Sequence, residues 1–457
     1  MPGRAATILM IGSAKSSWAV HHLDHESLAE GGSYLVKSPS AALRLLCAIP
    51  FLVGAFGWGE RQGVPPENRS GKTGDPISRL AKEIDSKART LAYEPSHGYL
   101  RALLSELHID PVSQVLVFSK TSFQSAFIDP STPRAIYFDG NCYVGWIPGA
   151  PNIEIITVDP ELGPQFYTLA NRRTAMPRFV KQTDDCFSCH DSPMTHNLPG
   201  LLTRSVYAAP DGRLLTAAGS YVTTSVSPIS ERWGGWYVTG KSGSQLHMGN
   251  EPARGPEANP TQDRRRGTNV TDLSRYFDTS TYLTPHSDIV SLMVLEQQTT
   301  ITNCINQAAQ STRAALKYAA DMLALGWERD HIDAGTIERV NHACEPLVRA
   351  LLGADEPALT SPLIPSNGFS KKFSLSAPPD PQGRRLSDLD LKTRILRYPC
   401  NPMIYCTGFR GLPTPARDHV LRRLREVLSG KDTSVQLPGV TSESRAAALA
   451  ILDATVH

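Results

Sequence analysis

The stretch AIYFDGNCYVGWI, residues 135–147, contains two short apolar runs, one on each side of the turn Asp139-Gly140-Asn141. Runs of this length that are rich in aromatic and β-branched residues are typical of strands. A short turn with a central glycine is typical of the connection in a β-hairpin. The stretch therefore predicts two antiparallel strands, and it is the strongest indication of the fold class in the chain.

Further short runs on both sides of this hairpin predict an antiparallel sheet. They cover residues 112–118, 153–158, 165–169, 201–207, 214–224 and 235–239. Apolar residues at helical spacing predict helices from about residue 71, over 97–108, over 286–327 and 336–352 as an antiparallel pair, and a final one near 418–428. The expected fold is α+β, with an antiparallel β-rich core, N-terminal helices and a helical C-terminal part.

Composition divides the chain into four segments. Residues 71–250 are expected to form the β-rich domain and residues 270–457 a mainly helical domain. Between them, residues 251–269 are rich in Pro, Gly and charge, which predicts a linker or exposed loop. Residues 1–57 resemble a leader, with basic Lys37 and Arg44 before an apolar run that ends near Trp58.

The leader predicts export to the periplasm, with cleavage after Gly57. Its first region is long, so residues 1–35 would precede the true start of translation. An uncleaved membrane anchor and a buried apolar helix are the alternatives. We therefore expect a periplasmic protein with peripheral or no membrane association, anchored only if the leader stays attached.

The charge balance excludes one class of partner. The 457 residues include 46 Lys and Arg against 44 Asp and Glu, a formal net charge of +2. Nucleic-acid binders usually carry a strongly basic surface. No nucleic-acid partner is therefore expected.

The motif with the most specific chemistry is Cys186-Phe187-Ser188-Cys189-His190. Two thiols at this spacing can each bond to one vinyl group of a haem, and the following histidine can then coordinate the iron. The motif predicts one covalently attached haem c, with Cys186 and Cys189 as thioether anchors and His190 as the proximal ligand. A zinc site, which would need a second ligand pair, and a redox or structural cysteine pair are the alternatives.

A sixth iron ligand would distinguish an electron carrier from an enzyme, because an enzyme leaves that position open. Met248 and His247 lie about 60 residues beyond the motif and are the favoured candidates, with structural roles as the alternative. Weaker candidates are Met194, His196, His286 and Lys120.

A group of basic and aromatic residues follows the motif. Arginine suits the haem propionates and tryptophan suits the macrocycle. Arg204, Arg232 and Trp233 are therefore predicted to bind the cofactor, with Trp236 and Tyr237 beside them. An ordinary sheet core with solvated arginines would explain the same residues.

Five cysteines remain outside the leader and the motif. Cys400 and Cys406 are close enough in sequence to form a disulfide, and Cys304 and Cys344 lie in neighbouring predicted helices. Buried reduced cysteines that act as small apolar residues would explain Cys142 and these four equally well.

A longer pattern resembles a family of exported bacterial proteins described as cytochrome c domain-containing. It consists of the Cys186–His190 motif, Leu198-Pro199-Gly200, Ser230-Glu231-Arg232-Trp233-Gly234-Gly235-Trp236-Tyr237-Val238-Thr239-Gly240, His247-Met248-Gly249-Asn250 and Leu391-Lys392-Thr393-Arg394, within residues 95–430. The resemblance implies haem binding and electron transfer. In the family a histidine often follows the position of Glu296, where this chain has Gln297.

The sequence thus predicts a monohaem electron-transfer protein of the periplasm. Its partner would be a periplasmic electron donor or acceptor, either a protein or a small molecule. A haem-dependent oxidoreductase with an open distal site, similar to a peroxidase or oxidase, is the alternative, because simple carriers are much shorter chains. A haem-based sensor of a small ligand is a third hypothesis.

Overall fold

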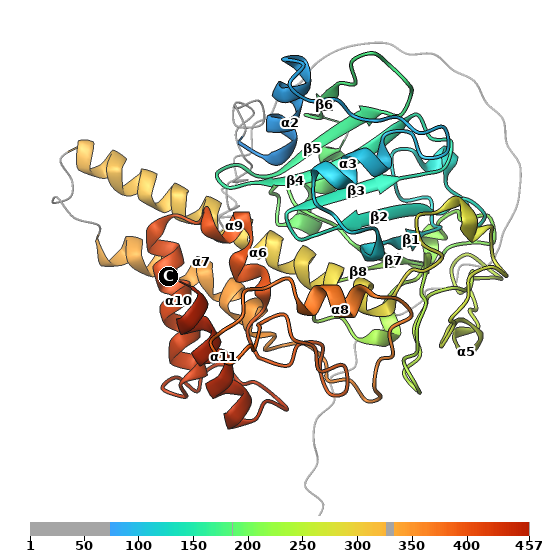
Figure 1. Cartoon of the computed structure of the whole chain (residues 1–457). Helices are drawn as coiled ribbons and strands as arrows, with labels where there is room; N and C mark the ends of the chain where they lie inside the picture. The colour runs from blue at the N-terminus through green and yellow to red at the C-terminus, as the bar shows by residue number, and fades with distance from the viewer. Residues whose placement is uncertain (1–73, 185, 326–332, 457) are drawn as a thin grey trace, which may run out of the picture. The chain divides into compact units, whose positions relative to one another are not determined.

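The computed structural model describes residues 74–184, 186–325 and 333–456 (Figure 1). The predicted leader, residues 1–57, lies outside these residues. The described residues belong to one compact unit. They form a mixed α+β fold with an antiparallel sheet in the N-terminal half and helices in the C-terminal part, as the sequence predicted. The sheet has seven strands, and the runs predicted as strands at 201–207 and 214–224 contribute to a separate two-stranded sheet.

The main sheet has the strand order β6-β5-β4-β3-β2-β1-β9, and its described neighbours are all antiparallel. A second sheet pairs β7 with β8. The strands are β1 (Val115–Val117), β2 (Arg134–Phe138), β3 (Cys142–Trp146), β4 (Asn152–Asp159), β5 (Gly163–Ala170), β6 (Phe179–Lys181), β7 (Arg204–Val206), β8 (Ser220–Val222) and β9 (Trp236–Tyr237).

The hairpin predicted from residues 135–147 is confirmed as β2 and β3. Phe138 pairs with Tyr143 across the turn, and Gly140 adopts a positive φ of 95° that favours glycine. Asp139 Oδ1 accepts the backbone N–H groups of Asn141 and Cys142 at 2.9 and 2.8 Å. The aspartate thus closes the turn from its own side chain, as in an Asx turn.

The described part of the chain contains ten α-helices. They are α2 (Pro76–Asp85), α3 (Leu100–Glu106), α4 (Phe187–His190), α5 (Arg264–Gly267), α6 (Ile289–Ala324), α7 (Ala334–Leu352), α8 (Phe369–Ser374), α9 (Thr407–Arg410), α10 (Thr414–Leu428) and α11 (Ser442–Thr455). Five of them, α2, α3, α6, α7 and α10, correspond to predicted helices, with shifted boundaries. The helix predicted from His97 begins at Leu100, because Gly98 has a positive φ of 63°. α10 is not the final helix, since α11 follows it.

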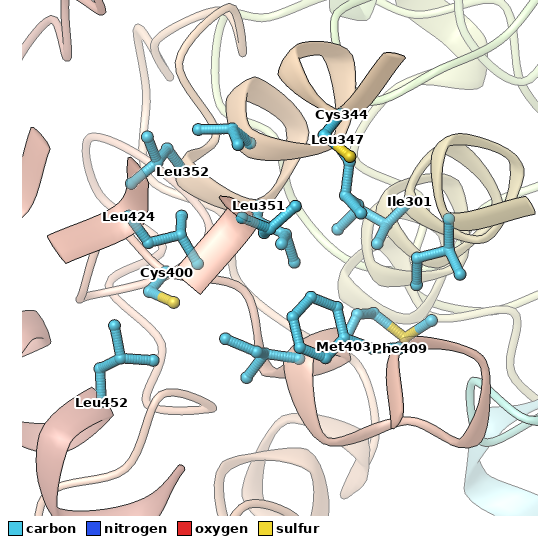
Figure 2. Close-up of a cluster of buried hydrophobic side chains, with 14 of the residues drawn as sticks. Ile301, Cys344, Leu347, Leu351, Leu352, Cys400, Met403, Phe409, Leu424 and Leu452 are labelled. Atoms are coloured by element: carbon cyan, nitrogen blue, oxygen red, sulfur yellow. The ribbon is translucent and has the colours of Figure 1, made fainter. Parts of the chain in front are cut away.

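α6 connects the two halves of the fold. Asp288 caps its first turn by accepting the N–H groups of Val290 and Ser291. Residues near its start pack with strand residues such as Val115 and Tyr143. Its later residues pack with α7 and α10 in a second core, part of which Figure 2 shows around Ile301, Leu347 and Leu424.

The predicted linker, residues 251–269, does not separate two cores. Residues 254–259 are exposed, as expected of a loop. Leu273 and Phe277, which follow the segment, pack in one cluster with the strand residues Tyr137 and Tyr237. The start of the predicted helical domain therefore belongs to the sheet core.

The described helices include no candidate for a membrane span. Even α6, at 36 residues, lacks an apolar window of the required length and hydropathy.

Candidate functional site

The Cys186–His190 motif forms a single helical turn, α4, with Cys186 at its N-cap. Phe187 is buried and packs edge-to-face against Phe166 of β5, with ring centroids 5.2 Å apart. Cys189 is exposed and Cys186 is partly exposed. Phe187 therefore anchors the turn on the sheet, and neither cysteine is enclosed in the protein core.

His190 is held in one orientation. Its Nδ1 lies 2.8 Å from the carbonyl oxygen of Gly200, and Gly200 N donates to the His190 carbonyl at 2.8 Å. The imidazole also packs against Phe166, with ring centroids 5.0 Å apart. Because a carbonyl only accepts, Nδ1 must carry the proton, which leaves the lone pair on Nε2.

This arrangement is the one that metal-binding histidines commonly use. A backbone carbonyl that accepts from one ring nitrogen fixes the tautomer and points the other nitrogen at the metal. Within the described residues, Nε2 of His190 has no hydrogen-bond partner. Burial lowers the pKa of His190, which favours the neutral ring that a metal ion binds.

The segment that orients His190 is itself held by α6. Asn303 accepts the Leu201 N–H and donates to the Leu201 carbonyl, both at 2.8 Å. Asn306 donates to the Pro199 carbonyl at 2.7 Å. The two asparagines thus bind the backbone on either side of Gly200, so α6 fixes the position of the carbonyl that His190 uses.

We expect Gly200→Ala to release His190. A Cβ at Gly200 would lie 2.8 Å from Asn303 Oδ1 and 2.9 Å from Thr195 Cβ, so the segment must shift. The variant should lose about 1–3 kcal/mol of unfolding free energy, as overpacked sites do. ¹⁵N NMR of the histidine rings should show His190 leaving its single Nδ1–H tautomer.

Gly368→Ala is the matched control for this prediction. No atom lies within 4 Å of a Cβ placed there, and the residue does not have a positive φ. An unchanged His190 tautomer in Gly200→Ala would show that the carbonyl of Gly200 does not orient the ring.

Two large apolar side chains lie exposed close to the turn. Val180 of β6 is 55% exposed, and it pairs across the ladder with Thr168. Since Thr168 and Phe166 lie two residues apart on β5, they share one sheet face, and Val180 lies on the face on which Phe166 contacts His190. Met194, four residues beyond His190, is 39% exposed. An apolar group bound at His190 would cover such side chains.

The structure gives Met248 and His247 other partners. Met248 is fully buried, and its sulfur accepts the Ser205 hydroxyl at 3.6 Å. His247 packs on Trp233 with ring centroids 5.0 Å apart, and its Nδ1 accepts the Gly249 N–H at 3.1 Å. His247 therefore carries its proton on Nε2, and burial lowers its pKa to about 3. To bind iron, each side chain would have to leave these partners.

Arg232 also differs from the prediction, because its guanidinium is used inside the protein. It is fully buried and forms an ion pair with Glu296 of α6. Its other N–H groups donate to the carbonyls of Ser225 and Ser227. A propionate could bind Arg232 only in competition with these acceptors, so the arginine serves as a structural link between the sheet region and α6.

Arg204 and Trp233 each have an N–H donor without a regular hydrogen bond in the described part of the chain. Both line a narrow cavity with Thr223 and Glu296. In the described part of the chain, Nε of Arg204 and Oγ1 of Thr223 are buried without a hydrogen-bond partner. The indole N–H of Trp233 faces the Glu296 carboxylate outside regular hydrogen-bond geometry. The space that they line has no room for a water-sized group and already holds the Glu296 carboxylate, so an acidic ligand could reach Arg204 or Trp233 only if the site opened.

The other sequence candidates are dispersed. Trp236 donates to the Arg204 carbonyl and Tyr237 donates to the Pro130 carbonyl, so both serve the sheet core. The weaker ligand candidates lie in loops or turns: His196 has a positive φ and is exposed, His286 precedes the cap of α6, and Lys120 follows β1.

No disulfide joins Cys304 to Cys344 or Cys400 to Cys406, so for these four cysteines the structure favours the alternative of reduced thiols. Cys344 and Cys400 pack in the helical core that Figure 2 shows. Cys406 packs in the same core and also caps α9 by accepting the Phe409 N–H at 3.4 Å. Burial raises the pKa of Cys304 and Cys344 to about 11 and that of Cys400 to about 12, which leaves them unreactive. These cysteines act as small apolar residues.

Among the described residues, no group of three or more His, Cys, Asp and Glu side chains is arranged to hold a metal ion by itself. No family model, curated protein or solved structure matches the chain.

Sequence reasoning missed the groups that orient His190. The Gly200 carbonyl is a backbone atom, and Asn303 lies more than a hundred residues away. Leu198-Pro199-Gly200 was part of the quoted pattern and is the one signal that could have indicated this role. Glu296 was likewise noted only as a position in the pattern, although it is the buried partner of Arg232.

Proposed function

We propose that this chain is a monohaem c-type cytochrome that transfers electrons in the periplasm. One observation carries the proposal: His190 directs Nδ1–H to the Gly200 carbonyl, so Nε2 is left for iron, on the same turn that presents Cys186 and Cys189. Thioether bonds to both cysteines would hold the macrocycle over this histidine. The haem would supply the one-electron chemistry, and the protein would fix its position and its proximal ligand.

Residues around the motif have further roles in this proposal. α6 holds residues 199–201 through Asn303 and Asn306, so His190 cannot turn without disturbing the helix contact. Arg204 has one unpaired N–H, but the fold encloses it, so a propionate could use it only if the side chain moved. The redox partner would be a periplasmic protein or small molecule that reaches the exposed side of the turn.

A second function is favoured by the placement of Met248 and His247. Because each has other partners in the folded core, neither would bind the iron unless the core rearranges, and the sixth position would stay open if no weaker candidate fills it. An open iron binds peroxide, oxygen or another small ligand, as in a haem-dependent oxidoreductase or sensor. We place this function second, since the orienting of His190 is common to both.

The optical spectrum tests the two functions. The chain would be produced with haem-maturation machinery, and its oxidised and reduced spectra recorded with and without carbon monoxide. A low-spin reduced spectrum that ignores carbon monoxide would support the electron carrier. A high-spin spectrum that shifts with carbon monoxide would support the open site, and a protein without haem would contradict both.

We expect Met248→Ala to leave the reduced spectrum unchanged and to destabilise the fold. The Met248 side chain is fully buried beside Ser205, so its truncation should cost about 2–5 kcal/mol, the usual loss for a buried methionine. The reduced optical spectrum of the variant tests the first expectation, and denaturant unfolding measures the loss of stability. A shift from low-spin to high-spin iron would instead show that Met248 leaves Ser205 to bind the iron.

A further inference from the structure

A cavity of about 280 Å³ lies between the sheet and the helical part, away from the residues of the haem motif. Its walls come from the β2–β3 hairpin, α6, α8 and the segment around Pro402. This volume is at the lower end of the range of small-molecule sites, which suits a ligand of one or two rings. None of its lining residues belongs to the Cys186–His190 turn, so the site is independent of the haem.

One residue that lines the cavity, Gln298, has a buried polar atom that the protein leaves unsatisfied. Gln298 of α6 is only 6% exposed, and its Oε1 is buried with no hydrogen-bond partner among the described residues. A buried acceptor without a partner costs about 1–3 kcal/mol. A ligand that donates a hydrogen bond to Gln298 would recover this free energy.

The neighbouring amide side chains, Gln297 and Asn401, form hydrogen bonds within the protein. Asn401 donates to Gln297 Oε1 at 3.3 Å, and Gln297 Nε2 donates to the Glu356 carboxylate at 2.8 and 2.9 Å. Their interactions are made within the protein although both residues line the cavity. Gln298 is therefore the group that would select a ligand.

Three phenylalanines form an aromatic wall. Phe369 has Phe138 on one side and Phe373 on the other, with ring centroids 5.9 and 5.7 Å away. Phe138 and Phe369 are buried, whereas Phe373 is half-buried. Such a wall favours a flat ring that can pack offset or edge-on against it.

The charges around the cavity disfavour an anion. Lys372 is paired with Asp110, and Asp139 adds a second carboxylate to the lining. His108 is the other basic side chain there. A carboxylate or phosphate ligand would thus face two carboxylates and only one paired ammonium, which favours an uncharged ligand.

We propose that this cavity binds an uncharged aromatic molecule that carries a hydroxyl group. The ring packs against Phe138, Phe369 and Phe373, and the hydroxyl donates to Gln298 Oε1. The class of ligand is a phenol.

The test compares phenol with anisole, in which a methyl group replaces the donated hydrogen. Binding to the full chain would be measured by ligand-observed NMR titration. Phenol should bind about fivefold more tightly than anisole, as one net hydrogen bond of ordinary strength gives. In Gln298→Met, which keeps the length of the side chain but removes the acceptor, the two affinities should become equal.

Two further variants keep the result decisive. Gln436→Met, at an exposed glutamine, should keep the preference for phenol. Phe373→Ala, at a half-buried position, should weaken both probes by removing part of the aromatic wall. The proposal is overturned if neither probe binds the unmodified chain, if both bind equally, or if Gln298→Met still prefers phenol.

Discussion

The double variant Cys186→Ala/Cys189→Ala is expected to lose all covalently bound haem and to keep its fold. Cys189 is exposed and Cys186 partly exposed, so the two truncations remove little buried surface. Phe187 on Phe166 and His190 on Gly200 still anchor the turn. Haem staining after denaturing electrophoresis, together with acid-acetone extraction, measures attachment, and circular dichroism reports the fold.

The control for this variant is Cys304→Ala, a partly buried thiol outside the motif that should retain full staining. Haem that stays attached in the double variant would contradict the assignment of the two thioether anchors. An unmodified protein that binds one zinc ion instead, or that forms a Cys186–Cys189 disulfide, would favour one of the two other interpretations of the motif.

Local signals in the sequence predicted much of the sheet. The β2–β3 hairpin follows from its own turn, because Asp139 and Gly140 supply the hydrogen bonds and the positive φ that the turn requires. β9 is different: residues 235–239 predicted a strand, but its pairing with β1 joins segments about 120 residues apart. Such pairings depend on the packing of the whole fold, which no local pattern contains.

Helix boundaries show the same limit. Asp288 is a recognisable N-cap two residues beyond His286, yet the prediction placed the start of the helix at the histidine. α11 was missed although Thr441 caps it, since its sequence is rich in alanine and has a weak apolar pattern. The helix becomes stable by burying Ile451 and Leu452 in the core that Figure 2 shows around Leu424.

At the candidate site, too, the features that depend on neighbouring residues could be predicted, and those that depend on distant residues could not. The motif itself was readable because its chemistry depends on five consecutive residues. The role of Arg232 was not, because nothing in its neighbourhood indicates Glu296, which lies 64 residues further on. A buried arginine and an arginine that binds a propionate look identical until the partner is known.

Arg232→Met should cause the largest loss of stability. The variant leaves the Glu296 carboxylate buried without its cation, and removing one partner of a buried ion pair costs about 3–5 kcal/mol. Replacing both partners, in Arg232→Met/Glu296→Leu, should recover most of that loss, since well-packed apolar residues often substitute for such a pair. Denaturant unfolding of the two variants measures both effects.

Arg89→Met is the matched control for the ion pair. Arg89 is about half exposed and pairs with Glu83 and Glu106, so its replacement should cost far less stability than the replacement of Arg232. An equally small loss in Arg232→Met would show that Glu296 reaches water or another partner when the arginine is gone.

The loss in Arg232→Met should also depend on pH. Burial raises the pKa of Glu296 to about 7, and the Arg232 guanidinium opposes that rise. Between about pH 4.5 and about pH 7, folded Glu296 therefore holds a proton that the unfolded chain has already released. The contribution of Glu296 to the unfolding free energy falls as pH rises through this window.

Without Arg232 the pKa of Glu296 rises further, so the fall in stability continues to higher pH. Unfolding free energies should thus differ more between variant and unmodified protein at about pH 8 than at about pH 5. A difference that is constant or shrinks with pH would mean that Glu296 is not the carboxylate that Arg232 compensates.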